Sequence, residues 1–362
     1  MNKLRQSYLA LLNGEKPNLV FYFFPIVSLI ILIAFPLILT RNTWWEAFDY
    51  TKTGEIGDTI GGITGPIIAL LAALITFLAF WVQLQANKAQ TKQFDIQDVA
   101  NKLDSFERRF FELIKMHRDN VAEFDIENAV KGRKVFVPMV SELKFCYHVL
   151  KGVYNAQKDL LINAEPFTER DFMNISYITF FAGVGENSEK LTLNALDIYG
   201  EPFLRHYFGV LTKHQETYER NGRISVEIEN GTYDLIMKYK PFCGHINKLG
   251  HYFRHLFQIV KYVDEQDDSI VTKKYDYLKT LRAQLSTHEQ LLMYYNAMSS
   301  MGEPWIEKKY LSEFRMIKNI PLPYADIGIP PKEFLGMFNS LGELIFEWDE
   351  IKERTKKRPD RR

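Results

Sequence analysis

The chain has 362 residues, with 45 basic and 45 acidic side chains and 2 cysteines. This balance of charge produces no net field that would favour nucleic acid or acidic partners. So few cysteines in a chain of this length exclude a disulfide framework and suit a reducing compartment. Aromatic side chains make up 14% of the residues, which is enough apolar bulk for one large domain or two.

Two uncharged apolar stretches near the N-terminus predict transmembrane helices. Residues 19–39 and 63–82 contain no charged side chain, and a helix of about 20 residues crosses the ~30 Å hydrocarbon core of a bilayer. The first stretch is too long for the apolar region of a signal peptide, and no small-residue cleavage site follows it. The sequence therefore predicts a two-helix transmembrane hairpin, with spans at 19–39 and 61–83 and an external loop at 40–60.

The distribution of lysine and arginine predicts the orientation of these spans. Basic residues precede the first span, within residues 1–18, and follow the second. The loop at 40–60 holds only Arg41 and Lys52, beside four acidic residues. Under the positive-inside rule, both termini of this multi-pass protein then lie in the cytoplasm.

A long helix is predicted to follow the second span. No proline or glycine occurs between Pro66 and Gly132, so a helix can run unbroken through the juxtamembrane segment 84–121. Apolar side chains recur there at steps of three and four residues, which is typical of a seam packed on a partner helix or a domain core. The alternative is a stalk that transmits conformational change or dimerises. The seam consists of Leu103, Phe106, Phe110, Leu113, His117 and Val121.

Residues 122–350 are predicted to form a mainly α-helical cytoplasmic domain. Alternating apolar residues around the turn dipeptide Asn230-Gly231 predict one small β-hairpin at 223–236. The tail at 351–362 is basic, and we expect it to be solvated or to be attracted to an anionic surface. Helical periodicity occurs at 134–157, 189–219, 245–265, 273–300, 305–317 and 331–353.

The first candidate functional cluster lies at 243–263. His251 and His255 are four residues apart, a spacing that lets two imidazoles share a metal ion. However, no glutamate follows His251, and the upstream residues have no recognised ligand spacing. A polar network between helices that includes Arg254 is the favoured interpretation, and no metal or other cofactor is predicted.

The second candidate cluster lies at 281–299. Arg282 and His288 have five residues between them, which matches the loose arginine–histidine signature of helical (HEPN-class) ribonucleases. His288 also shares a helix face with apolar residues, which favours a structural network, and a catalytic role belongs only to the ribonuclease alternative. The polar residues expected to matter in the two clusters are Tyr252, Arg254, His255, Arg282, Glu289 and Asn296.

Three glycines form a ridge of small residues at the start of the second span. Gly57, Gly61 and Gly65 recur at steps of four. Small residues allow helices to approach closely in lipid, so this ridge is a candidate helix contact. The alternative is ordinary flexibility where the chain enters the membrane. Signatures of a phosphate loop, a dinucleotide fold, a hydrolase elbow and a zinc Cys-x-x-Cys pair are absent from the sequence.

Five segments together carry a family resemblance. The segments 57–85, 250–264 and 277–302 carry most of it, and 108–121 and 132–143 extend it. The Tyr-Phe-Arg-His and Leu-Arg-Ala-Gln-Leu-Ser blocks are its most specific parts. In these segments the chain resembles the phage abortive-infection proteins of bacteria, of the AbiC type. That resemblance implies defence against bacteriophage by growth arrest or death of the infected cell, and it carries over no catalytic residue.

We therefore expect a membrane-anchored antiphage protein of the bacterial cytoplasmic (inner) membrane. Its helical domain would sense an infection product or partner and couple that event to the membrane hairpin. The expected partners are the lipid bilayer, further copies of the chain in a homo-oligomer, and a phage or host protein trigger, with nucleic acid as an alternative. The competing hypotheses are a membrane-tethered ribonuclease that uses Arg282 and His288, and a non-toxic regulatory or scaffold protein.

Reporter fusions test the predicted topology. A reporter that is active only outside the cytoplasm is expected to be active in the loop at 40–60 and silent at either terminus, because basic residues flank the spans on the opposite side. A second reporter, active only inside the cytoplasm, controls for expression of each fusion. Activity of the external reporter at the C-terminus would contradict the orientation.

Overall fold

The computed structural model describes residues 56–157, 166–229 and 231–356, together with the helical residues Val27, Ile30 and Ala34. The predicted first span at 19–39 lies outside this part of the chain apart from those three residues. Residues 1–18, most of the loop at 40–60 and the end of the basic tail also lie outside it. Within the described residues, one helix is long and apolar enough to cross a membrane. The predicted hairpin of two spans is therefore not shown.

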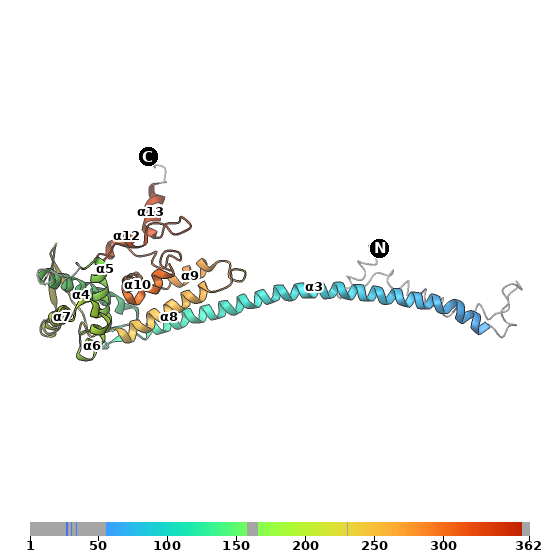
Figure 1. The fold of residues 1–362 in the computed structure, drawn as a ribbon, viewed down its shortest axis with the longest axis horizontal. Coiled ribbons are helices and arrows are strands. Elements are labelled where there is room, and N and C mark those ends of the chain that lie inside the picture. Colours follow the sequence, from blue (N-terminus) through green and yellow to red (C-terminus); the bar gives the residue numbers. More distant parts are fainter. Residues whose placement is uncertain are drawn as a thin grey trace. The chain divides into compact units, whose positions relative to one another are not determined.

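Helix α3 (Ile56–Ala122) contains this apolar segment (Figure 1). None of the residues in its most apolar 18-residue window is buried, and the side chains of Leu70, Phe77 and Phe80 are 64–72% exposed. Such a surface is costly in water, at about 25 cal/mol per Å², but it matches the hydrocarbon core of a bilayer. The predicted unbroken helix after Pro66 is confirmed, because α3 contains that proline and continues without interruption to Ala122.

The chain divides into two compact units, Met1–Gln97 and Asp98–Arg362. The second unit is mainly helical, as predicted (Figure 1). At its centre α4 packs against α5, and α10 packs against both. All side chains of α10 from Glu289 to Met298 are buried, as expected for a helix enclosed on every side. The helices after α3 are α4 (Phe136–Gln157), α5 (Glu169–Ala182), α6 (Glu186–Ala195), α7 (Glu201–Asn221), α8 (Ile246–Asp264), α9 (Lys274–Arg282), α10 (Thr287–Met298), α11 (Glu303–Glu307), α12 (Pro331–Leu335) and α13 (Glu347–Lys356).

Two small antiparallel hairpins accompany the helices. Strands β3 (Ile224–Ile228) and β4 (Gly231–Leu235) pair in register, which confirms the predicted hairpin. The second hairpin pairs β1 (Asp125–Ile126) with β2 (Val130–Lys131) directly after α3. The sequence patterns do not predict this second hairpin, because each of its strands is only two residues long.

Two predicted helices are each divided in the structure. The helix predicted at 273–300 is α9 followed by α10, because Ser286 forms a capping box with Glu289 that starts a new helix. The helix predicted at 189–219 is α6 followed by α7. A 3₁₀ turn and Gly200 separate these two, and the φ of 87° at Gly200 is a conformation that side chains disfavour.

The two helices predicted nearest the C-terminus are shorter in the structure. The helix predicted at 305–317 stops at the end of α11, and Lys309 adopts a left-handed φ of 54° soon afterwards. The helix predicted at 331–353 is α12 and α13, separated by a loop in which Gly336 and Gly342 have positive φ. Positive φ cannot continue a right-handed helix, so these positions break the predicted pattern.

The last part of α3 packs on α8 and α9 within the second unit (Figure 1). Phe106 stacks on Tyr262 of α8, with ring centroids 5.4 Å apart, and meets Tyr277 of α9 edge-on at 5.0 Å. Phe110 meets Tyr277 edge-on at 5.3 Å. The predicted seam is therefore confirmed, and α8 and α9 are its partners. Phe106, Phe110, His117 and Val121 are buried, and Leu103 and Leu113 are partly buried against the core.

Two adjacent phenylalanines on α3 provide a matched test of this packing. Phe110 is 0% exposed, whereas Phe111 is 52% exposed. We expect Phe110→Ala to lower the free energy of unfolding by about 3–5 kcal/mol, because it leaves a cavity in the seam. Phe111→Ala should cost about 0.5 kcal/mol or less. Denaturant unfolding of the full-length protein in detergent measures both values, and equal losses for the two variants would contradict the packing.

Candidate functional site

Helix α8 uses its two sides for different contacts. On one side, Tyr252 lies 4.9 Å from the ring of His117 on α3, and His255 stacks on the same imidazole with centroids 5.8 Å apart and planes 9° apart. On another side, Gly250, Arg254 and Phe257 line a pocket. One helix therefore lies in contact both with α3 and with the pocket.

The pocket has a volume of about 500 Å³, which is within the range of small-molecule sites. It lies between α8 and the short helix α11, with side chains of α5 and α10 contributing to its wall. Phe257 of α8 and Trp305 of α11 meet edge-on at 5.1 Å and form one aromatic part of this wall. The lining residues are Phe181, Ile246, Leu249, Gly250, Phe253, Arg254, Phe257, Gln258, Asn296, Met301, Pro304 and Trp305.

Arg254 supplies a positive charge to the pocket. Its Nε donates a hydrogen bond to the carbonyl of Gly250 at 2.8 Å, and among the described residues no carboxylate pairs with its guanidinium. A Cβ at Gly250 would lie 3.5 Å from Nη2 of Arg254 and 3.6 Å from Cζ of Phe181, which is ordinary contact distance. Because both of these atoms belong to lining residues, the missing side chain of Gly250 leaves part of the pocket open.

Asn296 supplies a buried amide. Its side chain donates from Nδ2 to the hydroxyl of Tyr177 at 3.0 Å, and its Oδ1 accepts no hydrogen bond from a described residue. The residue is only 4% exposed and lines the pocket. The amide oxygen is not among the fully buried polar atoms that lack a partner, so it is accessible to solvent from the pocket side.

A buried carboxylate next to this region has all its partners within the protein. Glu289 is fully buried at the start of α10, and its Oε2 accepts hydrogen bonds from the backbone N–H of Ser286 at 2.7 Å and pairs with Nε of Arg133 at 2.9 Å. Its Oε1 accepts from the Tyr252 hydroxyl at 3.2 Å, and burial raises the pKa of that hydroxyl. These contacts join α8, α10 and the segment after β2, so Glu289 has a structural role.

A second buried carboxylate fixes the start of α8. Glu142 of α4 accepts hydrogen bonds from the backbone N–H of Phe242 at 2.6 Å, from the Tyr239 hydroxyl at 3.1 Å and from Nε2 of His245 at 2.9 Å. No spacing in the sequence predicts this network, because Glu142 lies about 100 residues before its partners. Its consequence is that α8 begins at a position determined by α4.

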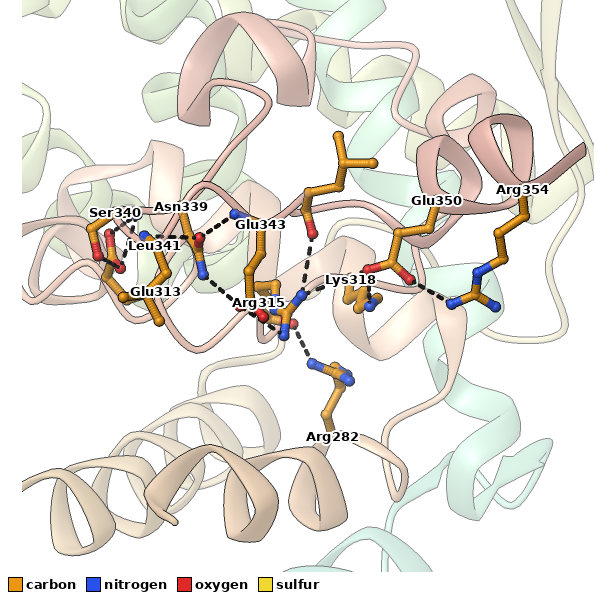
Figure 2. Close-up of polar contacts among 11 residues, drawn as sticks. Arg282, Glu313, Arg315, Lys318, Asn339, Ser340, Leu341, Glu343, Glu350 and Arg354 are labelled. Carbon is orange, nitrogen blue, oxygen red and sulfur yellow. Dashed lines mark hydrogen bonds and ion pairs between the residues drawn. The ribbon is translucent and has the colours of Figure 1, made fainter. Parts of the chain in front are cut away.

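Arg282 belongs to a separate network, which Figure 2 shows. Its Nη1 donates to the backbone carbonyl of Arg315 at 2.9 Å. The guanidinium of Arg315 lies 4.3 Å above the ring of Tyr275 and pairs with Glu343 at 3.2 Å and Glu350 at 3.6 Å. This network attaches the segment that contains α13 to α9, and no spacing in the sequence predicts Arg315 as its centre.

The structure gives Arg282 and His288 different surroundings. Arg282 is buried among Arg315 and Tyr275, as described above. His288 is half-buried at the start of α10, and burial together with the nearby charge of Lys144 lowers the pKa of its imidazole. No hydrogen bond or ion pair joins the two side chains in the described part of the chain. The two side chains therefore have separate partners in the described structure.

His251 and His255, the candidate metal ligands, have different surroundings from each other. His255 stacks on His117 of α3, and His251 is exposed. Across the described residues, no group of three or more histidine, cysteine or acidic side chains comes together in an arrangement that could hold a metal ion.

The six predicted polar residues occupy four places. Tyr252 and Glu289 share a hydrogen bond, and Arg254 and Asn296 line the pocket. His255 contacts α3, and Arg282 belongs to the Arg315 network. Two of the six residues, Arg254 and Asn296, therefore line a pocket that the sequence patterns did not predict.

These features define a mainly helical protein with one long helix that contains an apolar segment and with a ligand-sized pocket in its second unit. The family model described as "Putative phage abortive infection protein" matches residues 244–324. The match confirms the resemblance over this segment, and every residue that lines the pocket except Phe181 falls within it. No curated protein and no solved structure matches the chain.

The buried imidazole of His117 predicts a pH dependence of stability. Burial, followed by the charges of His255 and Arg133, lowers the pKa of His117 from its ordinary 6.5 to about 4. Between pH 4 and pH 6.5 the unfolded chain binds a proton at His117 and the folded protein does not. The contribution of neutral His117 to the free energy of unfolding is therefore complete above pH 6.5 and is lost as the pH falls toward 4. The loss should be about 2 kcal/mol at pH 5 relative to pH 8.

The variant His117→Leu isolates this contribution. It keeps an apolar side chain against Tyr252 and removes the titrating group, so its unfolding free energy should fall less steeply with acid than that of the natural protein. Denaturant unfolding at pH 8 and pH 5 measures the difference between the two proteins. Parallel pH profiles would contradict the assignment.

Proposed function

We propose that the protein is a membrane-anchored bacterial antiphage defence protein, in which the α8 pocket binds a trigger produced during infection. The observation that carries the proposal is the position of α8, which lines the pocket on one side and packs on α3 on another. Almost all of the pocket lies in the segment that matches the abortive-infection family. The output of the protein is proposed to act at the membrane.

The membrane anchor is proposed to consist of the apolar part of α3 and the predicted span at 19–39. Both termini would lie in the cytoplasm, in agreement with the distribution of basic residues. Gly57, Gly61 and Gly65 are proposed to contact another membrane helix, from the same chain or from a second copy. A Cβ at any of them would meet nothing within 4 Å, which leaves room for such a neighbour.

The proposed coupling passes through the side chains between the pocket and α3. A ligand beside Arg254 would change the position or the mobility of α8, because packed helices adopt discrete arrangements. Tyr252 and His255 of α8 contact His117, so a movement of α8 would act directly on α3. Since α3 is one helix from Ile56 to Ala122, it joins this contact to the apolar segment.

The ribonuclease alternative receives less support from the geometry. The guanidinium of Arg282 donates a hydrogen bond to the backbone carbonyl of Arg315 and lies over the ring of Tyr275. His288 makes no hydrogen bond to a described residue that would orient its imidazole. A general base needs an orienting partner and a reachable substrate proton. The placement of these two residues instead supports the structural interpretation.

Filling the pocket tests the proposed function. Gly250→Leu would place a side chain among the lining residues without a backbone clash, and it should raise helix stability by up to about 1 kcal/mol. We expect this variant to accumulate normally and to abolish protection from phage, measured as the efficiency of plating. The matched control is Gly209→Leu in α7, where a Cβ meets nothing within 4 Å, in contrast to the ordinary contacts at Gly250, and where no described pocket is lined.

Full protection by Gly250→Leu, at normal protein levels, would exclude the pocket as the trigger site. Loss of protection by both glycine variants would mean that the effect is not specific to the pocket, and it would also count against the proposal.

Replacement of residues 1–84 by an unrelated two-span anchor of the same orientation tests the membrane part. If the chimera protects as well as the natural protein, the membrane segment only localises the rest of the chain and takes no part in signalling.

A further inference from the structure

We infer that the α8 pocket binds a nucleoside phosphate, with the base among the aromatic side chains and the phosphate at Arg254. This inference rests on the proposed function, because it names the chemical class of the trigger for the same site. Three features of the pocket support it: its aromatic wall, its uncompensated guanidinium and its buried amide.

The aromatic wall offers a planar base chiefly the partly exposed ring of Phe257, because Phe181, Phe253 and Trp305 are only 2–7% exposed. Phe181 and Phe253 come from α5 and α8, and Phe257 contacts Trp305 at 5.1 Å. Stacking of a nucleobase on an aromatic side chain is favourable, and it tolerates different bases because each has a π face. The volume of about 500 Å³ is sufficient for a small ligand of this class.

The guanidinium of Arg254 suits a phosphate. Among the described residues no carboxylate neutralises it, in contrast to Arg133 and Arg315, each of which pairs with a glutamate. The guanidinium is planar and presents paired N–H groups, which match the geometry of phosphate oxygens. Arg254 is exposed, so its guanidinium is accessible to an anion from solvent.

The amide of Asn296 suits the edge of a base. Its Oδ1 has no hydrogen-bond donor among the described residues and remains accessible, although the residue as a whole is only 4% exposed. Amide side chains recognise nucleobases by offering an acceptor beside a donor. Gln258, also in the lining and on the same helix as Arg254, offers a second amide at the exposed side. An acyl carboxylate would use the guanidinium but would offer no hydrogen-bond donor to the amide oxygen, which favours the nucleotide.

Isothermal titration of the full-length protein in lipid nanodiscs tests this inference. The probes are AMP, GMP, CMP and UMP, with adenosine as a ligand without the anion, inorganic phosphate as a ligand without the ring, and dodecanoate as an acyl carboxylate. We expect saturable binding of at least one mononucleotide. Adenosine and phosphate should each bind about 10-fold or more weakly, because each lacks one of the two recognised groups.

Two variants connect binding to the pocket. Arg254→Gln should weaken mononucleotide binding about 10- to 100-fold, the range expected for loss of charge-assisted hydrogen bonds. Arg118→Gln is the matched control, because Arg118 is an exposed arginine on a helix and lines no described pocket, and its affinity should be unchanged. Gly250→Leu should remove binding. Binding of no mononucleotide, equal binding by all variants, or preferential binding of dodecanoate would each overturn the inference.

Plating assays with the same variants separate this inference from the proposed function. If no mononucleotide binds but Gly250→Leu still abolishes protection, the ligand class is wrong and the trigger site stands. If mononucleotides bind through Arg254 but Arg254→Gln and Gly250→Leu both protect fully, the nucleotide site stands and its role as the trigger site is wrong.

Discussion

The packing of the α3 seam on α8 and α9 is the constraint on which the rest of the account depends. Phe106 and Phe110 interlock with tyrosines of both partner helices, and His117 is enclosed against α8. Burial of aromatic side chains contributes about 1.5–3 kcal/mol each, with a further gain from edge-to-face geometry. This seam therefore holds α8 against the helix that contains the apolar segment, and any change at α8 must be accommodated there.

Two buried carboxylates and one buried arginine join the helices of the second unit. Glu142 fixes the start of α8, and Glu289 joins α8 to α10. Arg315 holds the segment containing α13 against α9, as Figure 2 shows. Each of these charges has its partners inside the protein, whereas Arg254 does not. That difference is what separates a structural charge from one available to a ligand.

Periodicity in the sequence predicted the elements that have one buried face. α3, α4 and α8 and the β3–β4 hairpin were predicted at nearly their observed positions, because apolar and polar residues alternate with a clear period in each. Helix α5 was not predicted, because its side chains from Phe172 to Ala182 are all buried and no polar face marks it. The capping boxes that begin at Thr168 and Ser286 are sequence patterns that predict the starts of α5 and α10.

The site was predictable only in part, for a different reason. Arg254 and Asn296 could be selected as polar residues on helices, but the pocket they share is built from segments far apart in the chain. Tertiary contacts also decided which polar residues are structural. Arg133 forms an ion pair with Glu289, and the backbone carbonyl of Arg315 accepts a hydrogen bond from Arg282. Neither contact follows from the spacing of residues in one helix.

The most direct test of the central claim is the order of events in infected cells. The account holds that a trigger at α8 acts through α3 on the membrane. A time course of membrane potential and RNA integrity after infection should therefore show the potential falling first in cells with the natural protein, and neither change in cells with Gly250→Leu at the same time. Cleavage of cellular RNA while the membrane potential is still intact would contradict the account.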